Sequence, residues 1–437
     1  MGGEWTSRPL RDCAVWYSGG TPSKGNPNYW NGDIPWISAK SLTEFFVGDS
    51  EDKVTEAGAN NGTRLVPKDT ILFIVRGMSL KSEFRMGITT RPVTFNQDLK
   101  ALVAVDDVLP AFLAYAIKAR IPEILGFVGE AGHGTGVLPT DRIQGLEIPL
   151  PPLDEQHAIA RILGTLDDRI ELNRQMNETL EAMARALFKS WFVDFDPVRA
   201  KAQGKRPIGM DPATAALFPS EFQDSELGEI PKGWSVVPFL DFADLLSGGT
   251  PKTSVLEYWN GSIKWASAKD VSQCGSFFLI DTERTITAAG LEHSATKIIP
   301  GGSVAVVARG ATCGRFTVFA EDMAMNQTCY ALVPRAIHAL WYLRFLANDL
   351  LVRLVAQAHG SVFDTITTRT FERARTVDPG PVVLELFETQ VSPVVNHIRC
   401  LHYENVTLAK LRDALLPRLL SGELSLAQAE QTVEATA

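Results

Sequence analysis

Two long stretches of the chain carry the hydrophobic spacing of an amphipathic helix. In the first, from Asp154 to Phe192, apolar residues recur three and four positions apart, so that they share one helix face. This predicted face consists of Ile159, Ile162, Leu163, Leu166, Ile170, Met176, Leu180, Met183 and Leu187. Asp154 follows two prolines and suits the N-cap position. We therefore predict one continuous helix here.

The second stretch, about Leu384 to Leu416, matches the first at an offset of 228 residues. The matched positions are Ile398 for Ile170, Asn405 for Asn177, Leu408 for Leu180 and Leu415 for Leu187. Asn173, Asn177 and Asn405 would fix the pairing of the helices if they lie in the apolar seam; otherwise they face solvent. Pro417 should end or kink the second helix, because proline lacks a backbone N–H.

The segments before each helix mix two other patterns. The runs "DTILFIVRG" and "GSVAVVARG" are typical of buried strands, while "PAFLAYAIKAR" and "HALWYLRFLANDLLVRLVAQA" have helical spacing. The Pro- and Gly-containing segment "DPVRAKAQGKRPIGMDP" separates the halves and is predicted to be a linker. We expect the chain to alternate globular unit, long helix, globular unit, long helix, with each globular unit of the α+β class.

An internal repeat relates the two globular units. Between Tyr29–Lys40 and Tyr258–Lys269, nine of twelve positions are identical at an offset of 229. Further matched pairs are Arg76-Gly77 with Arg309-Gly310, Asn96-Gln97 with Asn326-Gln327, His133-Gly134 with His359-Gly360, and Leu138 with Ile366. The repeat predicts two homologous domains related by an internal pseudo-two-fold axis.

Composition narrows the class of protein. The 437 residues are 45% hydrophobic, with 25 Pro and 34 Gly, which is typical of a folded protein of two to four domains. No apolar run approaches about 18 residues and no leader-like segment is visible, so we expect a cytoplasmic protein that does not bind membranes. The five cysteines lack metal-ligand spacing and are expected to be reduced and mostly buried.

The charge balance argues against a nucleic-acid binder that acts alone. The net charge is −9, whereas such proteins are often basic. Residues 5–150 carry 15 basic and 16 acidic side chains, and residues 233–378 carry 13 of each. Because both domains are near neutral, DNA binding would need local clusters of cations or a partner that supplies phosphate contacts.

In their order along the chain, the repeated blocks resemble the DNA-sequence specificity subunit of type I restriction-modification systems. The motifs that carry the resemblance are the doubled "SGGTP" and "YWNG.I.W.SAK" blocks, "IPLPPLDEQHAIARIL", "LFKSWFVDFDPV" and "ELGEIPKGW". They cover nearly the whole chain. One departure is that "PLPPLDEQ" is replaced by "DPGPVVLELFETQ" before the second helix, which leaves open whether two partner-docking surfaces are equivalent.

The resemblance implies two target recognition domains, each reading half of a split DNA site, and two long antiparallel coiled-coil helices that set the gap and dock two adenine methyltransferase subunits. The implied boundaries are 1–150 for the first target recognition domain, 151–200 for the first helical spacer, 201–232 for a linker, 233–378 for the second target recognition domain, 379–425 for the second spacer and 426–437 for a C-terminal tail. The coiled-coil or partner-docking residues would be Ile159, Leu163, Leu166, Ile170, Leu180, Leu187, Ile398, Leu408 and Leu415.

The candidate DNA-binding residues are the repeated polar and glycine positions. They are Ser18, Gly19, Gly20, Thr21, Lys40, Arg76, Asn96, Gln97 and His133 in the first domain, and Ser247, Gly248, Gly249, Thr250, Lys269, Arg309, Asn326, Gln327 and His359 in the second. Glycine permits close backbone approach, cations bind phosphate, arginine also grips guanine, and amides read adenine. Each has a structural alternative, namely a supporting turn, a solvated lysine, a structural ion pair or a buried amide cap. Trp36 and Trp265 are expected in the core.

No catalytic or metal-binding residue is predicted. The sequence lacks a phosphate loop, an adenine methyltransferase motif and HExxH. The resemblance implies a non-catalytic chain whose assembled complex would be an adenine-N6 DNA methyltransferase and ATP-dependent endonuclease. S-adenosylmethionine, Mg²⁺ and ATP would then belong to the modification and restriction subunits. A free-standing sequence-specific DNA-binding regulator is the alternative hypothesis, and a self-contained enzyme has no motif in its support.

Overall fold

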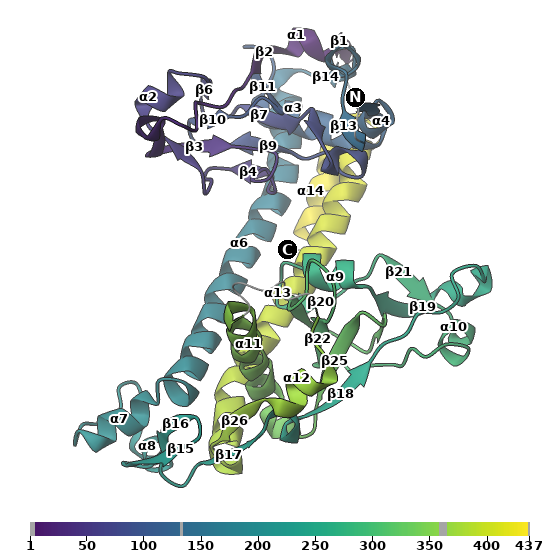
Figure 1. Cartoon of the computed structure of the whole chain (residues 1–437). Helices are drawn as coiled ribbons and strands as arrows, with labels where there is room; N and C mark the ends of the chain where they lie inside the picture. The colour runs from purple at the N-terminus through teal and green to yellow at the C-terminus, as the bar shows by residue number, and fades with distance from the viewer. Residues whose placement is uncertain (1–4, 132–133, 358–364, 436–437) are drawn as a thin grey trace. The chain divides into compact units, whose positions relative to one another are not determined.

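The computed structural model describes residues 5–131, 134–357 and 365–435, in a chain that divides into two compact units. Unit 1 holds residues 1–170 and 407–437, and unit 2 holds residues 171–406. The two long helices, α6 (Leu153–Phe192) and α13 (Pro381–Leu420), each contribute to both units (Figure 1). Each unit therefore contains one globular domain and a part of each long helix.

A five-stranded sheet forms the centre of the first domain. Its strands, in spatial order, are β2 (Ala14–Ser18), β11 (Leu99–Ala104), β7 (Ile71–Ile74), β9 (Met86–Thr89) and β4 (Phe46–Val47). The predicted strand in "DTILFIVRG" is β7, and all four of its residues are buried because it lies in the middle of the sheet. The predicted helix is α3 (Pro110–Ala119), which packs Phe112 and Leu113 into the same core.

The repeated motifs lie in the smaller sheets and turns of the first domain. One sheet contains β5 (Lys53–Val54), β3 (Trp30–Ile37), β10 (Val93–Phe95) and β6 (Leu65–Val66). Another contains β12 (Gly129–Ala131), β13 (Thr135–Val137) and β8 (Arg76–Gly77), and β1 (Thr6–Pro9) pairs with β14 (Glu147–Leu150). The short helices are α1 (Leu10–Cys13), α2 (Glu56–Ala59), α4 (Ile121–Gly126) and α5 (Thr140–Gln144).

The second domain repeats the strand order of the large sheet, with three strands instead of four in the smaller motif sheet. Its five-stranded sheet has the order β18 (Ala243–Ser247), β25 (Cys329–Pro334), β22 (Val304–Val307), β23 (Phe316–Phe319) and β20 (Phe278–Leu279). The smaller sheet is β21 (Arg284–Ile286), β19 (Trp259–Ala266) and β24 (Ala324–Met325), and β17 (Ser235–Pro238) pairs with β26 (Arg375–Asp378). The helices are α9 (Ala268–Gln273), α10 (Ala288–Glu292), α11 (Leu340–Gln357) and α12 (Thr368–Arg373).

The correspondence between the domains extends to strand direction. The edge pair is parallel in both large sheets, β4 with β9 and β20 with β23. The motif strands are also parallel, β3 with β10 and β19 with β24. The predicted strand "GSVAVVARG" is β22, with all four residues buried, and the predicted second helix is α11. The structure thus confirms two homologous α+β domains.

The segment predicted to be a linker is folded rather than extended. It contains α7 (Asp196–Ala202) and α8 (Pro212–Ala216), followed by a hairpin of β15 (Phe222–Ser225) and β16 (Gly228–Pro231). Val198 is fully buried and Phe218 is 1% exposed, so the segment contributes to the core of unit 2. Pro and Gly here mark helix starts and turns, because Pro197 and Pro212 occupy first-turn positions.

Both long helices extend beyond their predicted bounds. The prediction that Asp154 is the N-cap of α6 is wrong, because the helix has already begun at Leu153 and Asp154 lies in its first turn. Pro417 was predicted to end or kink the second helix; an end there is wrong, because α13 continues to Leu420, and the kink stays a prediction. The buried side chains of Leu415, Leu416 and Leu419 hold this last turn in the core, which outweighs the one missing N–H.

The predicted seam residues are buried within the chain's own cores. Ile159, Leu163, Leu166, Leu408 and Leu415 pack in the core of unit 1 with Ile170 at its edge, and Ile398 packs in the core of unit 2 with Leu180 and Leu187 at its edge. In both units the helices run antiparallel, as Asp167 facing Arg412 and Asn173 facing Asn405 show. Met176 and Met183 were predicted in this face but are 43% and 58% exposed.

In unit 2, asparagines rather than methionines lie between the two long helices. Asn173 and Asn177 are 7% and 8% exposed, and the Asn173 amide donates to Asn405 Oδ1 at 3.0 Å. The buried stripe therefore includes Asn173, Asn177 and Ala184, and Met176 and Met183 lie one position before Asn177 and Ala184. The interpretation that the asparagines lie in the seam is confirmed, and solvent exposure is excluded for Asn173 and Asn177.

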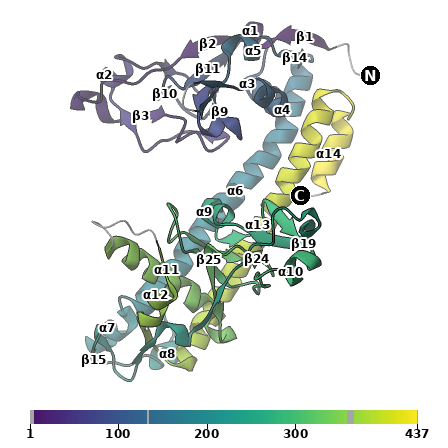
Figure 2. The ribbon, with the colours of Figure 1, turned by 45° about the vertical axis from the view of Figure 1, so that its right-hand side comes forward.

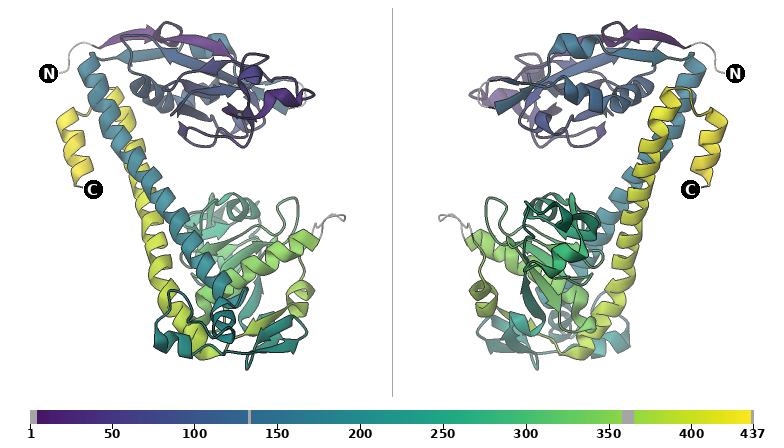
Figure 3. Two further views of the ribbon diagram at one scale, coloured as in Figure 1. Left: turned by 90° about the vertical axis from the view of Figure 1, so that its left-hand side faces the viewer. Right: turned by 90° about the vertical axis from the view of Figure 1, so that its right-hand side faces the viewer.

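The predicted C-terminal tail is a helix. It is α14 (Leu426–Glu434), which lies beside the ends of α6 and α13 within unit 1 (Figures 2 and 3). Ser425 closes its first turn with Gln428 in a capping box. Ala429 is fully buried, and Glu430 forms an ion pair with Arg161 of α6. Helix α14 therefore packs on the core of unit 1.

Candidate nucleic-acid interface

The first glycine-rich loop, residues 18–22, lies against the end of β10. Gly20 donates its backbone N–H to the Phe95 carbonyl at 2.9 Å. A Cβ on Gly19 would lie 2.3 Å from the carbonyl oxygens of Phe95 and Asn96, and one on Gly20 would lie 2.1 Å from the carbonyl oxygen of Gly62. Only glycine fits at both positions, which favours the supporting-turn interpretation for these two residues.

The second glycine-rich loop, residues 247–251, has the same construction. Gly249 donates its N–H to the Met325 carbonyl at 2.9 Å. A Cβ would lie 2.2 Å from the Asn326 carbonyl oxygen at Gly248 and 2.3 Å from the Thr296 nitrogen at Gly249. The loop and the Asn-Gln turn, 77 residues apart between Thr250 and Gln327, therefore meet in space, as they do in the first domain.

The repeated tryptophans support both loops. Trp36 and Trp265 are 6% and 5% exposed, which confirms that they belong to the core. Trp36 Nε1 donates to the Gly20 carbonyl and Trp265 Nε1 to the Gly249 carbonyl, each at 3.0 Å. The "YWNG.I.W" block is thus the platform on which the glycine-rich loop is seated.

A threonine holds the side chain of each repeated glutamine. Thr21 Oγ1 donates to Gln97 Oε1 at 2.7 Å, and Thr250 Oγ1 donates to Gln327 Oε1. Both glutamines are exposed. Their carbonyl oxygens are held by the loop, so the NH₂ group is the end of the amide that remains available.

The neighbouring asparagines are engaged within their own turns. Asn96 is 6% exposed; its Oδ1 accepts from the Asp98 backbone N–H and its Nδ2 donates to the Asp98 carboxylate. Asn326 Oδ1 accepts from the backbone N–H and hydroxyl of Thr328. Their geometry therefore favours the amide-cap interpretation over adenine reading.

The repeated lysines face carboxylates. Lys40 Nζ lies 3.5 Å from Glu51, and Lys269 Nζ lies 2.7 Å from Glu283. Lys40 lines a pocket of about 360 Å³ with Glu44, Asp49, Glu51 and Asp52. This acidic lining disfavours phosphate near Lys40. The Glu283 hydrogen bond raises the pKa of Lys269, which remains charged.

The repeated arginines lie where the sequence predicts them. Arg76 and Arg309 follow β7 and β22, and both are exposed. Within the described ranges, neither guanidinium has a carboxylate within 4.0 Å, which disfavours a structural ion pair. Arg76 pairs with Val137 in β13, and Arg309 forms a β-bridge with Thr365, so each Arg-Gly motif meets the segment after the histidine loop. His133 and His359 themselves lie outside the described residues.

Other site classes receive little support in the part of the chain that the structure describes. No group of three or more His, Cys, Asp or Glu side chains there has the geometry of a metal site, and no helix there is long and apolar enough to cross a bilayer. All five cysteines are free: Cys13 and Cys329 are buried, Cys274 and Cys313 half-buried, and Cys400 exposed. The candidates that remain are the repeated polar residues of the two domains.

Comparison with known protein families identifies the two repeated domains. The model of the type I restriction modification DNA specificity domain matches residues 2–182 and 231–374. The chain belongs to this family. The first matched segment of this specificity-domain chain contains the first repeated domain, and the second covers the second domain as far as residue 374, just before β26.

Individual relatives agree with this assignment. The specificity-domain chain is 26% identical over 429 residues to the type I restriction enzyme MjaIX specificity subunit of Methanocaldococcus jannaschii, covering 96% of this chain and 94% of the relative. It is 29% identical to the HindI specificity subunit of Haemophilus influenzae, covering 72% and 78%. A solved type I restriction-modification S subunit from M. genitalium shares the fold, with a TM-score of 0.55, 15% identity and coverage of 95% and 96%.

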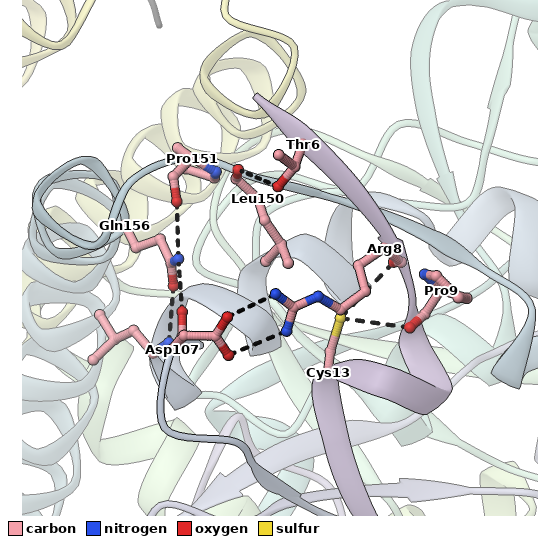
Figure 4. A network of polar contacts seen from close by, with 9 residues as sticks. Thr6, Arg8, Pro9, Cys13, Asp107, Leu150, Pro151 and Gln156 are labelled. Atoms are coloured by element: carbon pink, nitrogen blue, oxygen red, sulfur yellow. Dashed lines mark hydrogen bonds and ion pairs between the residues drawn. The ribbon is translucent and has the colours of Figure 1, made fainter. Parts of the chain in front are cut away.

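Sequence reasoning missed the side chains that attach each specificity domain to its long helix. In unit 1, Gln156 of α6 accepts from the Leu109 N–H at the start of α3 at 2.8 Å and donates to the carbonyls of Asp107 and Pro151 (Figure 4). Arg8 binds the Asp107 carboxylate through two nitrogens, and this ion pair lowers the pKa of Asp107. In unit 2, Glu388 of α13 accepts from the N–H groups of Trp341 and Tyr342 at the start of α11.

Two buried charge contacts complete these attachments. In unit 1, Asp167 of α6 accepts from Tyr115 at 2.9 Å and pairs with Arg412 at 2.5 Å, with Lys118 at 3.6 Å. In unit 2, Arg344 of α11 lies 3.0 Å from Glu181 of α6, and burial lowers its pKa to about 10. The sequence does not show which charged residues are buried, because their partners lie far away along the chain.

Proposed function

We propose that this chain is the DNA-binding specificity subunit of a type I restriction-modification complex. The observation that carries the proposal is the duplication: one chain holds two copies of a specificity domain whose glycine-rich loop, tryptophan platform and Thr–Gln pair agree residue for residue. Each domain would read one half of a bipartite target. A repeated reading domain suits a target that has two parts.

The proposed domain boundaries follow the sequence. Residues 1–150 and 233–378 would be the target recognition domains, and 151–200 and 379–425 the helical spacers, with 201–232 between them and 426–437 at the C-terminus. The spacers would set the gap between the two half-sites. Candidate DNA contacts are the exposed members of the predicted set, above all Arg76, Arg309, Gln97 and Gln327.

The helices would dock the methyltransferase subunits. The buried seam residues face the chain's own domains, so they are poor candidates for docking. Leu172, Met176 and Met183 are 60%, 43% and 58% exposed and share one face of α6. An apolar stripe of this kind supports a protein partner at this helix.

The chain itself would be non-catalytic. Its assembled complex would methylate adenine at N6 with S-adenosylmethionine and, with restriction subunits present, would translocate and cleave DNA using Mg²⁺ and ATP. These groups would bind the partner subunits. The relatives are named specificity subunits of restriction enzymes, which supports a division of labour of this kind.

The test is single-molecule methylation sequencing of DNA from cells that express this chain together with its methyltransferase, compared with cells that lack the chain. We expect a gapped adenine-methylation motif only when the chain is present. Absence of such a motif, while the same methyltransferase is active with another specificity chain, would refute the proposal. Site-specific binding by the chain alone, without a methyltransferase partner, would instead support a free-standing regulator.

A further inference from the structure

Each domain holds an equivalent set of polar residues on the segments that meet at the glycine-rich loop, and we call this set the polar cluster. In the first domain it consists of Gln97, which is held by Thr21, and of Arg64, which follows Thr63 in the sequence. Thr63 Oγ1 donates to the Phe95 carbonyl at 2.8 Å, and this carbonyl also accepts the Gly20 N–H. Three separate segments therefore meet at one backbone oxygen.

The second domain builds the cluster from equivalent residues. Thr296 Oγ1 donates to the Met325 carbonyl at 2.9 Å, which also accepts the Gly249 N–H. Thr296 is followed by Lys297, so a lysine stands where the first domain has Arg64. Gln327, held by Thr250, completes the cluster.

The cations of these clusters are not neutralised. Arg64 and Lys297 are exposed, and neither has a carboxylate partner within 4.0 Å among the residues described. Arg64 lies 4.9 Å above the Tyr17 ring, which limits its orientations. In the first domain Lys100 adds a further cation, whose Nζ donates to Ser18 Oγ at 2.6 Å. By contrast, the repeated lysines Lys40 and Lys269 are both paired with glutamates.

The duplication of the clusters indicates which part of DNA they contact. Under the proposed function, the two domains read two half-sites, and a side chain that is the same in both domains gives no means of telling two different half-sites apart. Duplicated groups must instead contact what the half-sites share, and every DNA segment shares its phosphates. Phosphate oxygens accept hydrogen bonds from amide N–H groups and attract arginine and lysine.

We propose that the cluster of Thr21, Gln97 and Arg64, and that of Thr250, Gln327 and Lys297, grip the DNA backbone rather than read bases. Thr21 and Thr250 are positioning residues: each fixes the glutamine carbonyl and turns the amide NH₂ outward. Base recognition then depends on side chains that differ between the domains. This proposal rests on the proposed function for its division into half-sites, but not for the phosphate contact itself.

The experiment measures binding of the full chain, with its methyltransferase, to a duplex carrying the methylated motif and to an unrelated duplex of equal length. Arg64→Gln and Lys297→Gln should each weaken binding to both duplexes by the same factor, several-fold at moderate salt, and reduce the slope of log K against log salt by about 0.9. Gln97→Ala should weaken both equally without changing the slope. Lys205→Gln, in an exposed lysine of the 201–232 segment, is the matched control.

Thr21→Val tests the positioning role. It should reproduce most of the loss caused by Gln97→Ala, and it should add little further loss when combined with Gln97→Ala. A merely structural role would instead give an additive loss of binding and would lower the stability of unit 1, relative to the wild type and to Lys205→Gln.

Two outcomes would overturn the inference: weakened binding to the motif alone, which means base reading, or unchanged binding to both duplexes. If the wild-type complex shows no preference for any motif, the proposed function fails. The unrelated duplex still decides the phosphate contact in that case, so the two failures remain distinguishable.

Discussion

Removal of the Asp167 carboxylate should loosen the first domain from its helices. Asp167 is 5% exposed and serves Tyr115, Arg412 and Lys118 together. In Asp167→Ala, the Arg412 guanidinium and the Lys118 ammonium, which are 15% and 17% exposed, lose this counterion, and removing one partner of a buried charge pair costs about 3–5 kcal/mol. Arg412 keeps its contact with Asp413 at 2.7 Å, so we expect the lower end, about 3 kcal/mol.

Hydrogen exchange of α3 and of the first half of α6, followed by mass spectrometry, measures this loss locally. The opening free energy of these segments should fall by about 3 kcal/mol in Asp167→Ala. Asp413→Ala is the control, because its carboxylate is 60% exposed and should contribute no more than about 1 kcal/mol. If both variants lose the same amount, Asp167 does not hold the domain and the reasoning is refuted.

Three further outcomes are expected. Met176→Glu combined with Met183→Glu should reduce co-purification of the methyltransferase at least tenfold and leave the free energy of unfolding unchanged. A tenfold loss of affinity corresponds to about 1.4 kcal/mol of binding free energy. Met78→Glu, at an exposed methionine of the first domain, is the control and should not reduce co-purification. Insertion of a few residues into 154–192 should lengthen the gap of the methylation motif and leave both half-sequences unchanged; unchanged spacing with retained activity would contradict the spacer role. Burial raises the pKa of Glu388 to about 7, so the folded state binds this proton more tightly than the unfolded state, and the stability of unit 2 should fall between about pH 4.5 and 7. Urea unfolding should show this fall, on the order of 1–3 kcal/mol, in the wild type and not in Glu388→Gln, and equal slopes would contradict it.

The domains were predictable from sequence because their motifs report backbone geometry. The "YWNG.I.W" block is retained because Trp36 and Trp265 each donate to a loop carbonyl, and the glycine pairs because no Cβ fits. Such constraints act on residue identity, so they leave a repeat that is visible in the sequence alone. The repeat then gives the strand order of the second domain once the first is known.

The helix faces were less predictable because hydrophobicity does not decide which side is buried. Asn173 and Asn177 are buried while Met176 and Met183 are exposed, the reverse of what their side chains suggest. The asparagine pair is possible only because Asn405 lies opposite Asn173. That contact joins positions 232 residues apart, and a periodicity argument on either helix alone does not contain it.

Comparison of the two units shows where the duplicated halves have diverged. The helix repeat at an offset of 228 matches Asp167 with Val395 and Arg412 with Ala184, so the ion pair of unit 1 corresponds to two buried apolar residues in the core of unit 2. The double change Asp167→Val with Arg412→Ala should therefore cost less than Asp167→Ala alone, because no unpaired guanidinium remains.

The attachments differ as well as the seams. Gln156 holds α3 in unit 1 with a neutral amide, whereas Glu388 holds α11 in unit 2 with a carboxylate and Arg344 reaches Glu181. The glycine-rich loops are alike in the two domains, whereas the contacts that attach each domain to its long helices differ. A replacement of residues 233–378 by another recognition domain should thus change one half-site only when the incoming domain keeps partners for Glu181 and Glu388. Without them, the Glu388 carboxylate, which is 8% exposed, loses the N–H groups of Trp341 and Tyr342, and Glu181 loses Arg344 and keeps Arg185 of its own helix. The exchanged domain should then detach before its specificity is expressed.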